Sequence, residues 1–236
     1  MKISVIMPTY NEKGNIVRLI KAIQKELNAK RKDIEQEYIV IDDNSPDKTA
    51  DFVKKTFRKD RRVRLSVRKN ERGLATAIKT GIRKSTGDVI LIMDTDFNHD
   101  PKDIPLLLDY ADDYDIVLGS RFVRGGGMEG AKLRWLGSYI FNLYVRIMTG
   151  LKTKDSQSGF IAVRKEVLGR FDLDSIFHGY GDFSLRMLYK AKKLSMTMKE
   201  VPVIYKKRTY GESKTRFVKH LFQYTMTVIR LRLGMD

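Results

Sequence analysis

The chain has 236 residues, of which 42% are hydrophobic, and a formal net charge of +17. This length and apolar content suffice for one globular domain with a substantial core. Because the chain has no cysteine, disulfide frameworks and thiolate metal sites are excluded. No stretch approaches the roughly 18 uncharged residues of a membrane span. The apolar run at 3–7 lacks the features of a signal peptide, so a cytoplasmic location is expected.

The first half of the chain alternates between two patterns. Short β-branched runs are typical of buried strands, and the stretches between most of them have the apolar spacing of helices. The predicted strands lie at 3–7, 38–41, 63–67, 89–93 and 115–118. The predicted helices lie at 15–27, 74–85 and 102–112. This alternation predicts an α/β fold with a mostly parallel sheet covered by helices on both faces.

The pattern changes after residue 122. Three glycines at 125–127 predict a flexible loop, and an aromatic-rich helix is expected over 132–149. The elements predicted after it are a strand and helix over 158–168, a helix over 182–193, an edge strand over 198–205 and a last helix over 216–233. No repeat, low-complexity tract or linker divides the chain.

Carboxylates cluster where two of the predicted strands end. Asp94-Thr95-Asp96 follows the most apolar strand, and Asp42-Asp43-Asn44-Ser45 follows the second one. In open α/β sheets, ligands bind at the carboxyl ends of the strands. Oxygen ligands gathered there suit Mg²⁺ or Mn²⁺, which are commonly held by one or two carboxylates together with substrate phosphates. The alternative is a solvated acidic turn, because a lone Asp-x-Asp is frequent by chance. His99 is interpreted as a structural residue beside this turn.

Two segments combine basic and apolar residues. In 132–149, apolar residues at three- and four-residue steps form one side of the expected helix, with aromatic residues beside them. These residues are Leu133, Leu136, Ile140, Leu143 and Ile147. The segment 216–233 has a similar stripe, formed by Phe217, Leu221, Tyr224, Val228 and Leu231. Basic ends and aromatic flanks predict helices that lie in a membrane interface, and an ordinary amphipathic core helix is the alternative for each.

The positive charge indicates an anionic partner, namely nucleic acid, a lipid surface or a phosphorylated substrate. A nucleic-acid-binding module is disfavoured, because the cations are interleaved with apolar faces and no recognised nucleic-acid motif occurs. We therefore expect no nucleic acid among the partners.

A series of short motifs resembles glycosyltransferase family 2, and within it most closely the dolichyl-phosphate mannose synthases. The motifs are MPTYNE (7–12), DDNSPDKT (42–49), MDTDFNHDP (93–101), GSRF (119–122), DSQSGFIAVRKEV (155–167) and RTYGESK (208–214). They occur in the expected order over roughly residues 3–215, which makes the series far more specific than any one motif.

The resemblance implies a GT-A fold and inverting transfer of mannose from GDP-mannose to dolichyl phosphate or another polyprenyl phosphate. It also implies a divalent metal, Mg²⁺ or Mn²⁺, and peripheral attachment to the cytoplasmic face of a membrane, with small membrane-spanning partner subunits. The implied catalytic domain covers 1–215, including an acceptor loop and interface helix at 123–150, and 216–236 forms a second interface helix.

The resemblance assigns roles residue by residue. The positions that match nucleotide contacts are Pro8, Tyr10, Glu12, Ile41 and Asp43. Asp94, Asp96 and Asn98 match the metal ligands, and Thr95 lies among them in the nucleotide-sugar site. The positions that match contacts to the diphosphate and acceptor phosphate are Arg121, Arg208 and Lys214, with Arg134 and Ser138 as further acceptor-phosphate contacts. Asp96, Arg121 and Arg208 are therefore expected to be the catalytic residues.

The reaction chemistry agrees with this assignment and leaves two alternatives. A phosphate monoester, with a second pKa of about 6, is already an anion at pH 7 and needs no general base. UDP-glucose or another UDP-sugar is an alternative donor for a polyprenyl phosphate. Asp182 resembles the base of family 2 enzymes that act on hydroxyl acceptors, and otherwise it is expected to be a helix N-cap.

Overall fold

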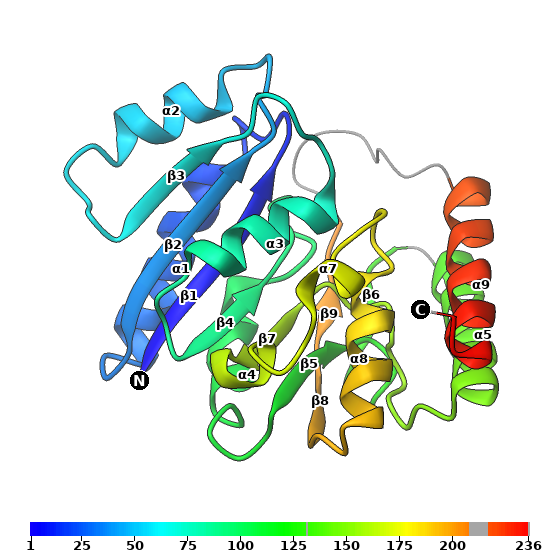
Figure 1. The fold of residues 1–236 in the computed structure, drawn as a ribbon. Helices are drawn as coiled ribbons and strands as arrows, with labels where there is room; N and C mark the ends of the chain where they lie inside the picture. Colours follow the sequence, from blue (N-terminus) through cyan, green and yellow to red (C-terminus); the bar gives the residue numbers. More distant parts are fainter. Residues whose placement is uncertain (131, 208–216, 236) are drawn as a thin grey trace.

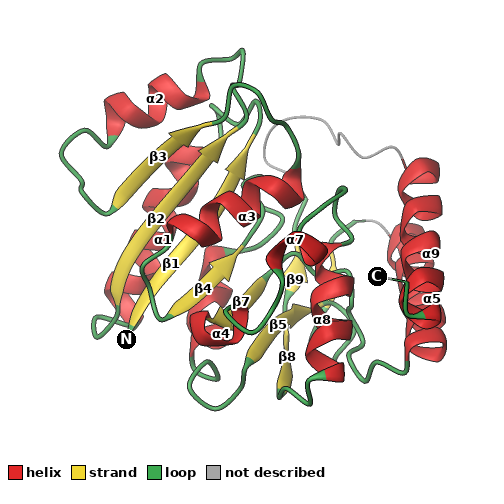
Figure 2. Cartoon of the chain, in the orientation of Figure 1, coloured by secondary structure: helices red, strands yellow, loops and turns green. Residues whose placement is uncertain are grey.

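The computed structural model of the chain describes residues 1–130, 132–207 and 217–235. Its centre is a seven-stranded sheet in the order β3-β2-β1-β4-β7-β5-β8 (Figures 1 and 2). β7 runs antiparallel to its neighbours β4 and β5, and the other pairings are parallel. The strands are β1 (Lys2–Thr9), β2 (Glu35–Asp42), β3 (Val63–Val67), β4 (Val89–Ile92), β5 (Ile116–Ser120), β7 (Ile161–Arg164) and β8 (Met198–Pro202). The predicted, mostly parallel sheet is confirmed.

Helices cover both faces of this sheet, as predicted. α1, α2 and α4 pack on one face, and α3, α6, α7 and α8 pack on the other (Figure 1). Their bounds are α1 (Ile16–Lys30), α2 (Thr49–Thr56), α3 (Leu74–Lys84), η1 (Pro101–Asp103), α4 (Ile104–Leu108), α6 (Lys165–Leu168), α7 (Leu173–Ile176) and α8 (Phe183–Lys193). The sheet is therefore the middle of three layers.

The sheet has a hydrophobic core on each face, and alternate side chains of a strand belong to different cores. Ile3, Val5 and Met7 of β1 belong to the core under α1, whereas Ile6 belongs to the core under α3. Side chains in a strand point alternately to opposite faces, so both parities must be apolar in a sheet covered on both sides. Gly81 lets α3 approach closely, because a Cβ there would lie 2.4 Å from Ile6 Cγ2.

Several elements differ from the sequence prediction. The helix expected over 102–112 ends at Leu108, and α2 was not predicted. The segment 198–205 forms two strands, not one, and the first of them, β8, ends at Pro202, opposite Ser120 at the end of β5. Its second part, β9 (Ile204–Tyr205), pairs with β6 (Gly127–Met128) in a separate two-stranded sheet, so the predicted glycine loop is partly a strand.

Two further helices, α5 (Lys132–Thr149) and α9 (Phe217–Leu233), lie side by side beyond the sheet (Figure 1). α5 buries Asn142, Val145 and Thr149. α9 buries Val228 and Leu231, both fully inaccessible to solvent. Among the described helices, none combines the length and the apolar character that crossing a membrane requires.

Candidate active site

A cavity of about 450 Å³ opens at the carboxyl ends of β1, β2 and β4, and α5 and α9 complete its wall. Most of the site residues predicted from the sequence line this cavity. They are Pro8, Tyr10, Glu12, Asp43, Asp94, Thr95, Asp96, Asn98, Arg121, Arg134 and Ser138. Residues from the motifs at 7–12, 42–49, 93–101 and 119–122 and from α5 therefore meet in one place.

The end of β4 presents a carboxylate pair. Asp96 is buried and accepts hydrogen bonds from the backbone N–H of Asn98 at 3.0 Å and from Asn98 Nδ2 at 2.9 Å. The Asn98 amide is thereby oriented, and its oxygen is the atom suited to a cation. Asp94 is more open to solvent, with 39% of its side chain exposed. These residues supply the hard oxygen atoms that the sequence predicted.

His99 supports this turn from behind. Its Nδ1 accepts from the backbone N–H of Asp94 at 3.1 Å, and its ring stacks on Phe160. Burial lowers the pKa of His99 to about 4, so the ring is neutral at physiological pH. Because Nδ1 accepts a hydrogen bond, the proton lies on Nε2, which is 4.0 Å from Asp94 Oδ2. The structural role predicted for His99 thus includes direct contact with a site residue.

Asp43 joins two loops at the end of the cavity where the predicted nucleotide contacts lie. Its Oδ1 accepts from Arg68 Nε at 2.7 Å, and its Oδ2 accepts from the backbone N–H of Gly73 at 2.8 Å. Asp43 therefore holds the segment 68–73 against the cavity, where Arg72 stacks on Tyr10 at 4.1 Å. The side chain of Ile41, in contrast, is fully buried in the core under α3 and does not line the cavity.

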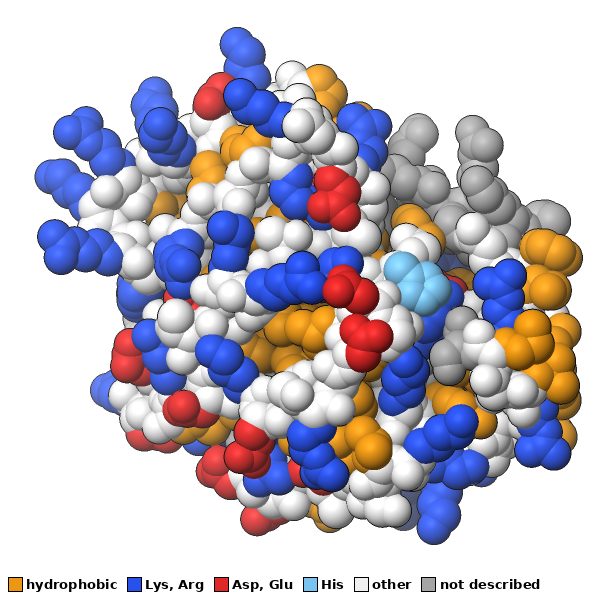
Figure 3. Space-filling model, viewed as in Figure 1, with side chains coloured by type: hydrophobic (Ala, Val, Ile, Leu, Met, Phe, Trp, Pro, Cys, Tyr) orange, Lys and Arg blue, Asp and Glu red, His pale blue; other side chains and the backbone are white. Residues whose placement is uncertain are grey.

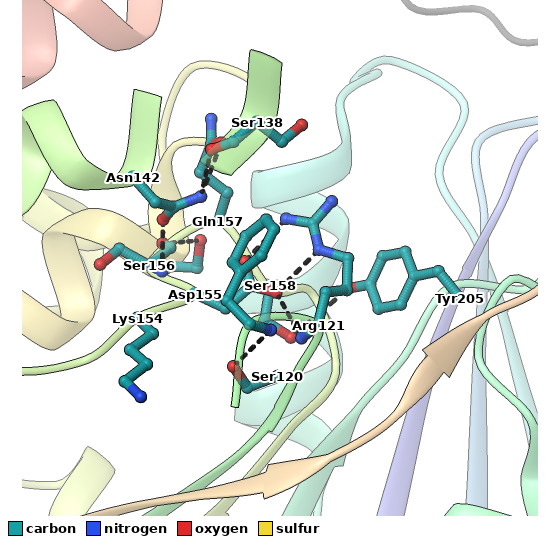
Figure 4. Close-up of polar contacts among 12 residues, drawn as sticks. Ser120, Arg121, Ser138, Asn142, Lys154, Asp155, Ser156, Gln157, Ser158 and Tyr205 are labelled. Carbon is teal, nitrogen blue, oxygen red and sulfur yellow. Dashed lines mark hydrogen bonds and ion pairs between the residues drawn. The ribbon is translucent and has the colours of Figure 1, made fainter. Parts of the chain in front are cut away.

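Arg121 forms the cationic side of the cavity. Asp155, which is fully buried, accepts from Arg121 Nε and Nη2, each at 2.7 Å (Figure 4). Although burial opposes the charge, this carboxylate raises the pKa of Arg121 above its ordinary value. The guanidinium also lies 4.7 Å from the ring centroid of Tyr205. Asp155 thus takes two of the three guanidinium nitrogens, and Nη1 has no hydrogen bond to another residue in the described part of the chain.

The loop that carries Asp155 is fastened to α5. Asn142 Oδ1 accepts from the backbone N–H of Ser156 at 2.8 Å, and Asn142 Nδ2 donates to the carbonyl of Ser138 at 2.9 Å (Figure 4). Arg134 and Ser138 lie on the same helix and line the cavity. Arg121 is therefore linked through the loop at 155–156 to α5, the helix that carries the predicted acceptor contacts.

Asp182 lies at the N-cap position of α8, but its side chain makes no capping hydrogen bond. Its Oδ2 instead accepts from Arg186 and from the hydroxyl of Thr227 in α9, the latter at 2.7 Å. The exposed fractions of Asp182, Arg186 and Thr227 are 5%, 3% and 3%. The Asp182 carboxylate therefore joins α8 to α9.

The outer side of α5 exposes the apolar stripe that the sequence predicted. Leu133 is 85% exposed and Ile147 is 74% exposed, and Leu136, Ile140 and Leu143 are exposed between them. In α9, the predicted stripe faces inward at Val228 and Leu231, whereas Phe222, Leu233 and Met235 are exposed. Hydrophobic side chains gather along this edge of the molecule (Figure 3). The alternative of a core helix thus applies to the inner side of α9, and attachment of its exposed side to a membrane stays a prediction.

Two predicted site residues, Arg208 and Lys214, lie outside the described residues. Sequence reasoning missed other residues of the cavity. They include Arg72, Phe141, Gln157, Tyr180, Tyr205 and Tyr224. Gln157 lies within the quoted motif at 155–167 and could have been inferred from it, whereas Tyr224 joins the site only through the packing of α9. Burial, followed by the charge of Asp182, raises the pKa of Tyr224, so its hydroxyl stays protonated at neutral pH.

Comparison with known proteins places these features in a family. The model of glycosyl transferase family 2 matches residues 4–171. The chain belongs to this family. It is 34% identical to the dolichol-phosphate mannosyltransferase of Pyrococcus furiosus, over 98% of this chain and 64% of the relative. It is 35% identical to the undecaprenyl-phosphate mannosyltransferase of Micrococcus luteus, over 91% of this chain and 87% of the relative. The predicted family and its glycosyltransferase class are thereby confirmed.

The yeast dolichol-phosphate mannosyltransferase of Saccharomyces cerevisiae is 31% identical over 89% of this chain and 80% of its own length. The chain spans 64% of the length of the Pyrococcus furiosus relative. Among solved structures, glucosyl-3-phosphoglycerate synthase from Mycobacterium tuberculosis, in complex with Mn²⁺ and UDP-glucose, superimposes with a TM-score of 0.72. That match covers 100% of this chain and 80% of the other at 18% identity. The likeness confirms the predicted GT-A fold.

Proposed function

We propose that this family 2 member transfers mannose, with inversion, from GDP-mannose to dolichyl phosphate or another polyprenyl phosphate at the cytoplasmic face of a membrane. One observation carries the proposal. A single cavity is lined by the carboxylates of Asp94 and Asp96 and by the cations of Arg121 and Arg134, directly beside an exposed apolar helix. The relatives that are named dolichol-phosphate and undecaprenyl-phosphate mannosyltransferases support this acceptor class and this sugar.

The residues at the end of β4 fit a divalent cation. Asp94, Asp96 and Asn98 bring carboxylate and amide oxygens to one turn, which are the ligands that Mg²⁺ and Mn²⁺ prefer. In the described part of the chain, no three His, Cys, Asp or Glu side chains gather closely enough to form a metal site by themselves. Such a sparse protein ligand set suits an ion that also binds substrate phosphates. When bound, the ion would neutralise the charge of the departing diphosphate.

The arrangement of the remaining residues supports a phosphate acceptor. A phosphate monoester oxygen is an anion at neutral pH and attacks the anomeric carbon without a base. The bond from this oxygen to the carbon forms as the bond to the diphosphate breaks, so GDP leaves and the configuration inverts. Arg121, oriented by Asp155, supplies the positive charge that holds two phosphates near each other. Asp182 is already engaged by Arg186 and Thr227, which disfavours a role as a base for a hydroxyl acceptor.

The exposed stripe of α5 supports contact with a membrane. Its apolar side chains lie on the same helix as Arg134 and Ser138, so a lipid-embedded α5 would present the cavity to a phosphate at the membrane surface. Basic residues near the helix add attraction to anionic headgroups, at roughly 1 kcal/mol each.

Transfer of labelled sugar into organic-extractable polyprenyl phosphate tests the proposal. GDP-mannose and UDP-glucose would be compared as donors, with Mg²⁺, with Mn²⁺ and with EDTA. We expect extractable label from GDP-mannose that EDTA abolishes. Label from UDP-glucose alone would contradict the proposed donor but support the proposed acceptor. If neither donor gives extractable label, the proposed polyprenyl-phosphate acceptor is contradicted, and a hydroxyl acceptor becomes the alternative to test.

Replacement of Asp96 tests the site itself. We expect Asp96→Ala to lower turnover by at least about 100-fold, because charge stabilisation at the leaving group is among the largest catalytic terms. The melting temperature should stay close to that of the unmodified protein, which separates the loss of a ligand from unfolding. Turnover within a few-fold of the unmodified protein would contradict the assignment.

A further inference from the structure

The segment Gly179-Tyr180-Gly181-Asp182 precedes α8, and the proposed mechanism gives it no role. Gly179 has a φ of +71°, a left-handed conformation that favours glycine. At Gly181, an added Cβ would lie 2.4 Å from the Tyr224 hydroxyl of α9. Both glycines are thus required by the local geometry, one by its backbone angle and the other by the close approach of a distant helix.

Asp182, the residue after Gly181, also contacts α9. Thr227 Oγ1 donates to Asp182 Oδ2 at 2.7 Å, and Arg186 binds the same oxygen. Arg186 Nη1 also donates to the carbonyl of His178 at 3.2 Å, so the loop is closed at both ends. All three side chains are at least nine-tenths buried, where a charge-assisted hydrogen bond is stronger than at the surface.

The anchored helix is also part of the cavity wall. Tyr224 and Leu221 of α9 line the cavity, as do Tyr180 and Gly181 of the loop. Tyr224 lies 6.3 Å from Phe141 of α5, measured between ring centroids. A displacement of α9 would therefore open the cavity on the side where Arg134 and Ser138 lie.

We propose that Asp182 and Thr227 are positioning residues that hold α9 as the wall of the acceptor end of the cavity. In this role, the aspartate that could have served as a base is used to dock the C-terminal helix. The assignment of this end to the acceptor rests on the proposed function, whereas the docking of α9 does not. The geometry assigns the Gly181–Tyr224 contact to the same docking site.

Thr227→Val tests the hydrogen bond, with two controls. Valine keeps the shape of threonine but removes the hydroxyl, and Thr227→Ser keeps the hydroxyl. Thr225→Val makes the same substitution two residues earlier, where the hydroxyl donates to the carbonyl of Leu221 in its own helix. We expect Thr227→Val to raise amide hydrogen exchange over 221–233 by about tenfold, which corresponds to one hydrogen bond to a charged group. Thr227→Ser and Thr225→Val should exchange like the unmodified protein.

The KM values for acceptor and donor distinguish a positioning role of Thr227 from a general loss of stability. For Thr227→Val we expect the KM for a short-chain isoprenyl phosphate to rise by about tenfold and the KM for GDP-mannose to change by less than about twofold. Equal changes in both constants, or unchanged exchange in α9, would overturn the proposal. If the unmodified protein transfers no sugar to the isoprenyl phosphate, the proposed function fails, and the exchange data alone decide whether the anchor exists.

A second pair of variants tests the glycine contact without changing the buried charges. Gly181→Ala should raise exchange in α9, because its Cβ would meet the Tyr224 hydroxyl. Adding Tyr224→Phe should restore protection, since the next atom of the ring lies 3.6 Å from the added Cβ. A Gly181→Ala protein with unmodified exchange, or one that Tyr224→Phe does not rescue, would contradict the contact.

Discussion

Aspartates around the cavity differ in the partners that surround them. Asp43, Asp155 and Asp182 each contact a buried arginine, which neutralises them. Asp94 lies 4.0 Å from the neutral ring of His99, and Asp96 accepts two hydrogen bonds from Asn98. Both line the cavity, where their carboxylate oxygens suit a divalent cation. Asp43, Asp155 and Asp182 thus each hold an arginine in place, whereas Asp94 and Asp96 lie together on the turn after β4.

The pair of Arg121 and Asp155 makes a quantitative prediction. Asp155→Asn leaves a buried guanidinium without its counter-charge, and breaking a buried pair in this way costs about 3–5 kcal/mol. We expect a loss of about 3 kcal/mol in the free energy of unfolding, measured by urea denaturation. The matched control is Asp33→Asn, which removes one of the two carboxylate partners of Arg31 at the surface and should leave stability nearly unchanged. Equal effects of the two variants would contradict the buried pair.

Asp103 gives a prediction about pH. Burial, with Asp100 nearby, raises the pKa of Asp103 from 3.8 to about 6. Between these values the folded protein keeps a proton that the unfolded chain has released, so stability falls as the pH rises through this window. Asp103→Asn removes this penalty and should stabilise the protein at pH 7.5 by about 1–2 kcal/mol, after allowance for partial solvent screening.

Thermal or urea unfolding at several pH values checks the prediction for Asp103. The gain should shrink below pH 4, where the carboxyl group is protonated in both the folded and the unfolded state. Asp112→Asn, a change at an exposed residue nearby, is the control and should have little effect at any pH. A gain that is the same at pH 4 and pH 7.5 would contradict the raised pKa.

At the scale of single residues, the sequence predicts those that act locally. The pair of Asp94 and Asp96 can be predicted from the sequence because both follow one apolar strand and share one turn. The contact of Asp182 with α9 cannot be predicted from the sequence, because its partner Thr227 lies 45 positions away in the chain. Periodicity and motif spacing carry no information about such a contact, so it is visible only once α9 is placed.

At the scale of elements, the amphipathic helices were predicted well and the short ones poorly. The bounds of α5 are the predicted 132–149, because eighteen residues give a clear helical period. α2 has only eight residues, of which two are buried, and so its period is weak. The outward side of α5 is apolar and exposed, which is unusual for a helix facing water.

The exposed side of α5 leads to a prediction about membrane binding. Ile140→Glu places a charge within the apolar stripe and should weaken binding to phosphatidylglycerol vesicles by tenfold or more, since burial of one such side chain contributes about 2 kcal/mol. Vesicle co-sedimentation measures this change, and GDP binding should be unaffected. Leu194→Glu alters an exposed apolar residue at the end of α8 and serves as the matched control. Equal loss in both variants would show a nonspecific charge effect.

At the scale of the whole molecule, the C-terminal helix packs against the rest of the chain. A boundary at residue 215 separates a tail from a catalytic domain by sequence, but Thr227, Val228 and Leu231 of that tail are buried against the rest of the chain. The amphipathic stripe alone could not distinguish a lipid surface from a protein surface, because both accept apolar side chains. The fold class, in contrast, followed from the order of strands and helices alone.

Deletion of 217–236 tests this division. Because the buried side chains of α9 are lost, we expect the melting temperature to fall by about 10 °C. Affinity for GDP should change by less than about threefold, since the proposed nucleotide end of the cavity is built by β1, β2 and β4. Differential scanning fluorimetry and calorimetric titration provide the two values. An unchanged melting temperature would mean that α9 serves only to attach the protein to a membrane.

The antiparallel direction of β7 determines which loops at the ligand edge of the sheet can change independently of one another. In an all-parallel sheet, every loop at the ligand edge follows a strand, whereas β7 brings the loop that precedes it to that edge. The segment 150–160 can therefore change in length or composition between α5 and β7 without altering any loop that follows β1, β2 or β4. Residues that this segment brings to the cavity, such as Gln157, can thus be exchanged while the residues that follow β1, β2 and β4 are kept.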